Sequence, residues 1–149
     1  MHKHETAEKL YCELIDVGEG EPRPIASGLV QHYSLEELSG RKVVVVCNLP
    51  PRKLVGFKSH GMVLCAVGED GSVELLRPPD DAKPGDRVSV DNHFNEPLSA
   101  KQCDKRDAWK RLSPLFKVRD GVGFWNQLKL VTAEGGECTT QKVTHGELG

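Results

Sequence analysis

Short apolar runs separated by turn residues dominate the first ninety positions of the chain. The runs are rich in valine and leucine and are bounded by Gly, Pro and Asp, a pattern that predicts β-strands. The six predicted strands are LYCELIDVG (10–18), PIASGLV (24–30), RKVVVVCNL (41–49), GMVLCAVG (61–68), VELLRPP (73–79) and DRVSV (86–90). One short helix, SLEELSG (34–40), is predicted among them, with Ser34 and Glu37 as a capping box and Gly40 at its end. Many short strands with one small helix favour an all-β fold, a small β-barrel.

The pattern changes from Ser99 onward. SAKQ (99–102) has the capping-box residues of a second helix, and its apolar positions are spaced by three and four residues, at Ala108, Trp109, Leu112, Leu115 and Phe116. Pro114 predicts that this helix ends near Ser113. One or two strands are expected in 123–136 and 138–143. The change of pattern divides the chain into a barrel (1–98) and an extension (99–149). The aromatic residues of the extension predict that it packs on the barrel.

Composition excludes several classes of protein. The 149 residues are 38% hydrophobic and 28% charged, as in ordinary globular domains, and no apolar run approaches the roughly 18 residues of a membrane span. Five scattered cysteines without a C-x-x-C pair indicate free thiols in a reducing compartment such as the cytoplasm, with Cys47 and Cys65 as core residues.

Charge is distributed unevenly, although the formal net charge is only −2. Residues 41–65 contain five Lys and Arg residues and no Asp or Glu, and residues 101–119 contain seven basic against two acidic residues. Two concentrated basic segments on a weakly acidic chain can form one positive face if the fold brings them together.

The segment RKLVGFKSHGM (52–62) combines cations with neutral hydrogen-bonding groups. Pro50 and Pro51 end the preceding strand, so a loop is predicted, and cations without a carboxylate suit phosphate and ribose oxygens. Composition alone fits a solvated loop equally well. The candidate binding residues are Asn48, Arg52, Lys53, Lys58, Ser59, His60, Gly61 and Met62, with Arg41 and Lys42 extending the field.

CNLPPRKLVGFKSHGMVLCA (47–66) resembles the signature of the tRNA-binding domain family of endothelial monocyte-activating polypeptide, some tyrosyl- and methionyl-tRNA synthetases and small bacterial tRNA-binding proteins. The segments KLYCELIDVGEGEPRPIASGLV and LLRPPDDAKPGDRV agree with the family in the same order, and DAWKRLSPLF to GVGFWNQLKL resembles the extension of eukaryotic members. The family's Lys in N-L-K-P is Pro50 here, and its Arg before Gly is Val55. Family members have one additional strand ahead of the segment that matches KHETAEKLY (3–11), and this chain is expected to lack that strand.

The resemblance implies an OB-fold β-barrel with the extension packed on it as a pseudo-dimer, and hence a monomer. It also implies a module that binds tRNA without sequence selectivity and delivers it to an aminoacyl-tRNA synthetase, with tRNA and synthetase-complex proteins as partners. The alternative is a protein-interaction module of a synthetase complex in which RNA binding is vestigial.

Other chemistry finds little support in the sequence. The histidines and cysteines do not stand at metal-ligand spacings, and no phosphate-binding glycine loop precedes a helix. Cys65 lies in an apolar run, which is a poor place for a nucleophile. We therefore expect no catalytic residue, no metal and no cofactor.

Overall fold

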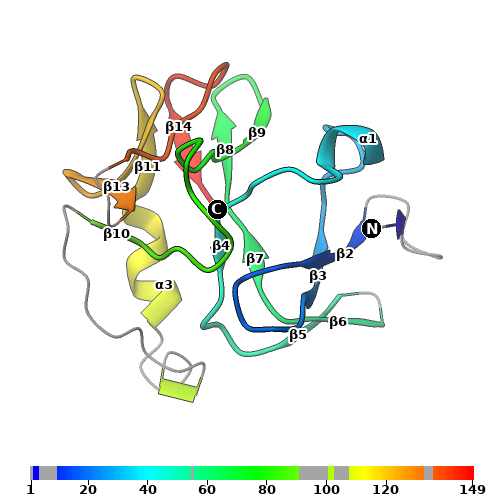
Figure 1. The fold of residues 1–149 in the computed structure, drawn as a ribbon. Coiled ribbons are helices and arrows are strands. Elements are labelled where there is room, and N and C mark those ends of the chain that lie inside the picture. The colour runs from blue at the N-terminus through cyan, green and yellow to red at the C-terminus, as the bar shows by residue number, and fades with distance from the viewer. Residues whose placement is uncertain (1, 4–9, 55, 91–100, 103–107, 133–135) are drawn as a thin grey trace.

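Short strands are the main regular element of the structure, a computed structural model (Figure 1). It describes residues 2–3, 10–54, 56–90, 101–102, 108–132 and 136–149. The strands before residue 91 are β1 (His2–Lys3), β2 (Tyr11–Ile15), β3 (Arg23–Ser27), β4 (Val45–Val46), β5 (Arg52–Leu54), β6 (Phe57–Ser59), β7 (Met62–Val63), β8 (Cys65–Gly68), β9 (Val73–Leu75) and β10 (Val88–Val90). Those of the extension are β11 (Phe116–Arg119), β12 (Val122–Trp125), β13 (Leu128–Thr132) and β14 (Gly146–Leu148). The helical segments are α1 (Leu35–Leu38), α3 (Ala108–Leu112) and the 3₁₀ turn η1 (Ser113–Leu115). The all-β prediction is confirmed.

The strands form four antiparallel sheets. Their orders are β1-β2-β3, β10-β13-β12-β11-β14-β8-β9, β4-β7 and β5-β6. Across the described residues the strands of the amino-terminal part do not close into one continuous barrel ladder. The predicted strand 41–49 contributes only two paired residues, Val45 and Val46, so the barrel remains OB-like but open.

Local signals in the sequence set the ends of both helices. At α1, Ser34 Oγ accepts a hydrogen bond from the Glu37 amide at 3.2 Å, and the Ser34 amide donates to Glu37 Oε1 at 3.0 Å, which is the predicted capping box. At α3, the helix ends at Leu112 and continues as a 3₁₀ turn that contains Pro114, as the proline predicted. The capping box predicted at Ser99 lies outside the described residues.

Two clusters of buried side chains form the core. One, beneath β2, β3 and α1, consists of Tyr11, Ile25, Leu29, Leu38, Val63, Cys65 and Leu75. The other combines both parts of the chain and consists of Val44, Leu64, Ala66, Leu76, Val118, Leu130, Cys138, Val143 and Leu148. Since this second cluster takes members from both sides of residue 99, the extension shares a core with the amino-terminal part, as the predicted packing requires.

The carboxyl-terminal strand joins the two parts through the backbone. β14 pairs with β11 on one side and with β8 on the other, where Glu147 lies opposite Val67. The main chains of Cys65 and Gly149 then exchange two hydrogen bonds, at 3.0 and 3.1 Å. The seven-stranded sheet therefore begins and ends with strands of the amino-terminal part, β9 and β10, and strands of the extension lie between them. The predicted boundary at residue 98 lies outside the described residues.

A buried carboxylate makes a second connection. Glu74, in β9, is 6% exposed, and its side chain accepts hydrogen bonds from the amides of Gln141, Lys142 and Val143 at 2.6–2.9 Å. Burial by itself would raise the pKa of Glu74, but the three amides outweigh it and lower the pKa.

The apolar positions Trp109, Leu112, Leu115 and Phe116 predict that this face of the second helix is buried within its own chain, but the structure buries only part of it. The rings of Trp109 and Phe116 lie 5.4 Å apart and pack against the second cluster, whereas Leu112 and Leu115 are 43% and 39% exposed. Leu115 lies in η1, where three residues per turn no longer continue the α-helical stripe. Leu112 is the last residue of α3, at the end of that stripe.

Candidate nucleic-acid interface

The segment predicted as a loop is a β-hairpin. β5 and β6 pair with Arg52 opposite Ser59, Lys53 opposite Lys58 and Leu54 opposite Phe57. Gly56, at the turn, has a φ of +81°, a conformation that glycine adopts without strain. These two strands could not be predicted from the sequence because they are only three residues long and each contains a single apolar residue.

The hairpin carries three exposed cations: Arg52, Lys53 and Lys58. Lys53 and Lys58 lie directly opposite each other, an arrangement that costs free energy when no anion is near. Within the described part of the chain, no ion-pair partner of the three is found. The hairpin therefore presents uncompensated positive charge to solvent.

Ser59 and Gly61 anchor the base of the hairpin rather than its surface. Ser59 is 3% exposed, and its hydroxyl accepts from the Ala26 amide at 2.9 Å and donates to the Gly61 carbonyl at 3.0 Å. A Cβ on Gly61 would lie 2.9 Å from Ile25 Cδ1. Both predicted binding residues are thus packed against β3. The Ser59 side chain is buried, so it presents no contact surface in this structure.

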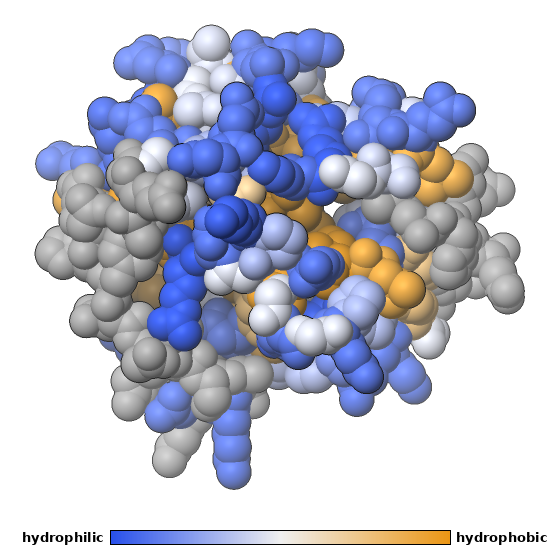
Figure 2. All heavy atoms as spheres, in the orientation of Figure 1, coloured by the Kyte–Doolittle hydropathy of each residue, from blue (hydrophilic) through white to orange (hydrophobic). Residues whose placement is uncertain are grey.

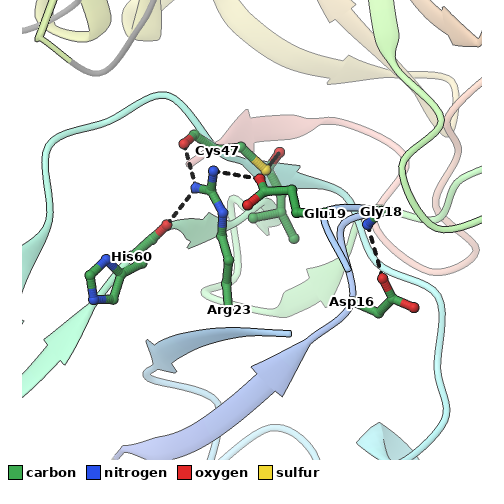
Figure 3. Close-up of polar contacts among 7 residues, drawn as sticks. Asp16, Gly18, Glu19, Arg23, Cys47 and His60 are labelled. Carbon is green, nitrogen blue, oxygen red and sulfur yellow. Dashed lines mark hydrogen bonds and ion pairs between the residues drawn. The ribbon is translucent and has the colours of Figure 1, made fainter. Parts of the chain in front are cut away.

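Three further predicted residues, Asn48, His60 and Met62, are half-buried beside the hairpin. Met62 pairs with Val46 and packs against the second core cluster. The His60 amide donates to the Pro24 carbonyl at 2.9 Å, and the His60 imidazole turns away from Arg23 (Figure 3).

Arg41 and Lys42 lie away from the hairpin. Figure 1 shows α1, which Arg41 follows, well apart from β5 and β6. The Arg41 guanidinium lies over the Tyr33 ring, 5.0 Å from its centroid, and Lys42 Nζ donates to the Asp80 carbonyl at 2.6 Å. The structure thus gathers Arg52, Lys53 and Lys58 on one element and leaves the other two cations elsewhere.

Arg23 is not among the residues predicted from the sequence, although it joins the segments before and after the hairpin (Figure 3). Its Nη1 donates to the Cys47 carbonyl at 2.6 Å and to the His60 carbonyl at 2.9 Å, while its Nη2 donates to Glu19 Oε1 at 2.6 Å. The Glu19 carboxylate raises the pKa of Arg23. One signal was available, a lone cation between two prolines in an acidic segment, EGEPRPI.

A hollow of about 400 Å³ lies at this arginine, lined by residues that include Glu19, Arg23 and Cys47, together with Pro51 and His60, which directly precede and follow the hairpin. Burial raises the pKa of the Cys47 thiol, so this thiol stays protonated at neutral pH. Cys47 is half-buried rather than the core residue expected, whereas Cys65 is buried as predicted and burial raises its pKa to about 12.

The surface around these elements is mostly polar. Figure 2 shows hydrophilic side chains over much of one face, with hydrophobic side chains reaching the surface in a band across its middle. Among the described residues, no three His, Cys, Asp or Glu side chains gather where they could hold a metal ion. The same residues include no helix with the length and hydropathy needed to cross a membrane.

An open OB-like barrel with a cationic hairpin defines a small all-β binding domain. The chain belongs to the family of putative tRNA-binding domains, whose family model matches residues 1–87. Together with the fold, this match confirms the resemblance drawn from the sequence.

Several aminoacyl-tRNA ligases contain a region similar to this chain. It is 40% identical over 148 residues to a probable methionine–tRNA ligase of Oryza sativa subsp. japonica, and 36% identical over 152 residues to the cytoplasmic tyrosine–tRNA ligase of Xenopus laevis. These matches cover 98% and 100% of the chain, but 18% and 29% of the ligases. It is also 43% identical to the mouse aminoacyl tRNA synthase complex-interacting multifunctional protein 1, with 96% of the chain and 46% of that protein covered.

Solved structures resemble the chain over different lengths. The crystal structure of the C-terminal domain of Plasmodium vivax p43 superposes with a TM-score of 0.83 at 33% identity, covering 98% of this chain and 88% of that one. A MetRS-related protein from Pyrococcus horikoshii gives a TM-score of 0.52 at 37% identity, covering 56% of this chain and 76% of that one. The first likeness thus includes the extension.

Proposed function

We propose that this chain binds tRNA through the hairpin β5–β6 and delivers it to an aminoacyl-tRNA synthetase, contributing binding rather than catalysis. The observation that carries the proposal is the pair Lys53 and Lys58, opposite each other on an exposed hairpin with Arg52 and without a carboxylate. A phosphate backbone supplies the missing negative charge, and the match to the tRNA-binding family supports tRNA as its source.

The proposed contacts are mainly with the RNA backbone. Lysine and arginine bind phosphates regardless of base, so affinity comes with little sequence selectivity and depends strongly on salt. Asn48, His60 and Met62, half-buried beside the hairpin, would meet ribose or base. Ser59 and Gly61 serve by positioning the hairpin on β3, and Arg41 and Lys42 add to the field from a distance.

The relatives support the delivery role. Two of them are tRNA ligases of which the chain spans less than a third, and a third is named as interacting with the synthase complex. We therefore propose that the chain acts as a domain appended to, or associated with, a synthetase in the cytoplasm, where catalysis belongs to other domains. Because the extension shares a core and a sheet with the barrel, we also propose a monomer.

Titration of labelled total tRNA with the chain at several salt concentrations tests this proposal. We expect the logarithm of the association constant to fall linearly with the logarithm of salt concentration, by about 0.7–0.9 for each phosphate contacted. Failure to bind tRNA at low salt would contradict the proposal. It would favour the protein-interaction alternative, for which the exposed side chains of Leu112 and Leu115 offer an apolar surface.

A further inference from the structure

We propose that the hollow beside the hairpin is a subsite for one unpaired nucleobase that carries an exocyclic amino group, so that cytosine, adenine or guanine binds better than uracil. The inference rests on the proposed function and adds to it a contact with a base. The hollow has a volume of about 400 Å³, within the roughly 300–1,000 Å³ of small-molecule sites.

The subsite is organised by Arg23. Two backbone carbonyls, those of Cys47 and His60, fix one nitrogen of the guanidinium. The other nitrogen holds Glu19 at 2.6 Å (Figure 3). The side chain of Arg23 is only 24% exposed, while that of Glu19 is 48% exposed. Glu19 is therefore held through one carboxylate oxygen, while about half of its side chain is exposed to solvent and the residue lines the hollow.

The lining of the hollow suits a base better than a phosphate. Pro22, Pro24, Leu49 and Pro51 contribute apolar surface, against which the flat faces of a base can pack. The lining also contains a second carboxylate, that of Glu21. Two carboxylates repel a phosphate group, and an ionised carboxylate accepts hydrogen bonds but donates none.

This acceptor-only chemistry distinguishes the bases. Cytosine offers an N4 amino group, which carboxylates accept in nucleic-acid recognition. Uracil has a carbonyl oxygen at the equivalent position and would place one acceptor against another there. The donor left on that edge of uracil, N3–H, is flanked by two carbonyl oxygens that the carboxylate repels, so uracil should bind more weakly. The base must be unpaired, because its Watson–Crick edge is then free, as in the loops and ends of RNA that proteins usually read.

The hollow adjoins the proposed phosphate contacts along the chain. Pro51 lines the hollow, and the next residue, Arg52, begins β5. An RNA strand whose phosphate is bound by Arg52 therefore passes the mouth of the hollow, where a neighbouring base can turn inward.

Fluorescence anisotropy with oligocytidylate and oligouridylate of equal length, at neutral pH and fixed salt, tests the subsite. The two probes carry the same charge, so their phosphate contacts are equal and their difference reports the base. We expect the chain to bind oligocytidylate about fivefold more tightly, the effect of one hydrogen bond. The variant is Glu19→Gln, whose amide can still accept from Arg23 but can turn its NH₂ group toward the hollow. We expect this variant to bring the ratio of the two affinities close to one.

Glu36→Gln is the matched control, because this substitution removes the same charge from a residue that is exposed on α1 and does not line the hollow. It should change both affinities equally and keep the ratio. Equal binding of the two probes by the unsubstituted chain would overturn the inference. It would also be overturned if Glu19→Gln increased the affinity for both probes by more than Glu36→Gln does, because a phosphate would then be bound at Arg23. Binding of tRNA but of neither probe would refute the subsite and leave the proposed function standing. Loss of tRNA binding would remove both.

Discussion

Lys53 and Lys58 lie directly opposite each other on the hairpin β5–β6, and Arg52 is exposed beside them. Like charges at such positions repel each other, so the hairpin is better suited to hold a polyanion than to stand alone. Arg23 donates hydrogen bonds to the carbonyls of Cys47 and His60, and so joins the segments that precede and follow this charged element.

Replacing Arg52, Lys53 and Lys58 together by Ala should weaken binding to all tRNAs alike. The magnitude of the slope of log K against log salt should fall by about two to three, because each phosphate contact contributes about 0.7–0.9. Anisotropy titrations with total tRNA measure both quantities. The matched control replaces Lys117, Arg119 and Lys129 on β11 and β13, which removes the same charge from the extension. An equal loss in the control would place the interface elsewhere.

Ser59→Ala should lower stability. The Ala26 amide would lose the acceptor that it finds 2.9 Å away, and Ala26 is itself 6% exposed. A buried donor without a partner costs about 1–3 kcal/mol, which urea denaturation can measure. Affinity for tRNA should be measured under conditions in which the variant is folded. It should fall only through displacement of the hairpin, and the slope of log K against log salt should stay unchanged. A variant as stable as the original chain, but about 1 kcal/mol weaker in binding, would restore the direct RNA contact first expected of Ser59.

Glu74→Gln should weaken the connection between β9 and residues 141–143. The neutral amide has one acceptor oxygen where the carboxylate uses two, so the free energy of unfolding should fall by about 1–3 kcal/mol at neutral pH. The folded-state pKa of Glu74 is lowered from its ordinary value of 4.5. Its contribution is therefore complete above about pH 4.5 and is lost as the pH falls through the lower, folded-state pKa.

Denaturation at several pH values measures this dependence. Between neutral pH and the acid range, the original chain should lose more stability than Glu74→Gln, so the difference between the two should shrink in acid. Glu69→Gln, on an exposed neighbouring residue, is the control and should leave the pH dependence as it is. A constant difference across the pH range would show that the Glu74 charge has no part in the connection.

Light scattering should give the mass of one chain, 16.4 kDa. The extension already occupies the second core cluster and the edge of β8 through β14, which leaves the exposed Leu112 and Leu115 as the apolar surface of α3 and η1. Changing both to Ser should leave the mass unaltered, because neither is needed for the core. A dimer that these two changes convert to a monomer would show that this surface joins two chains, and the pseudo-dimer interpretation would be wrong.

Features that depend on neighbouring residues could be predicted from the sequence. Alternating apolar runs predicted the strands, Ser34 and Glu37 predicted the start of α1, and Pro114 predicted the end of α3, because each acts within one or two turns of its own backbone. The cationic segment 52–58 was also visible, since charge is a property of the residues themselves. Its form as a hairpin was not, because strands of three residues carry too short a pattern.

How these parts meet could not be predicted from the sequence. Arg23 binds carbonyl oxygens of residues 24 and 37 positions away, and every residue has such an oxygen, so no sequence pattern marks which ones it will reach. Ser59 became buried because β3 lies against the base of the hairpin, and β14 joined the two parts because its backbone fits between β8 and β11. Contacts made by the main chain depend on where the chain returns in space, and that is decided by the packing of the whole molecule.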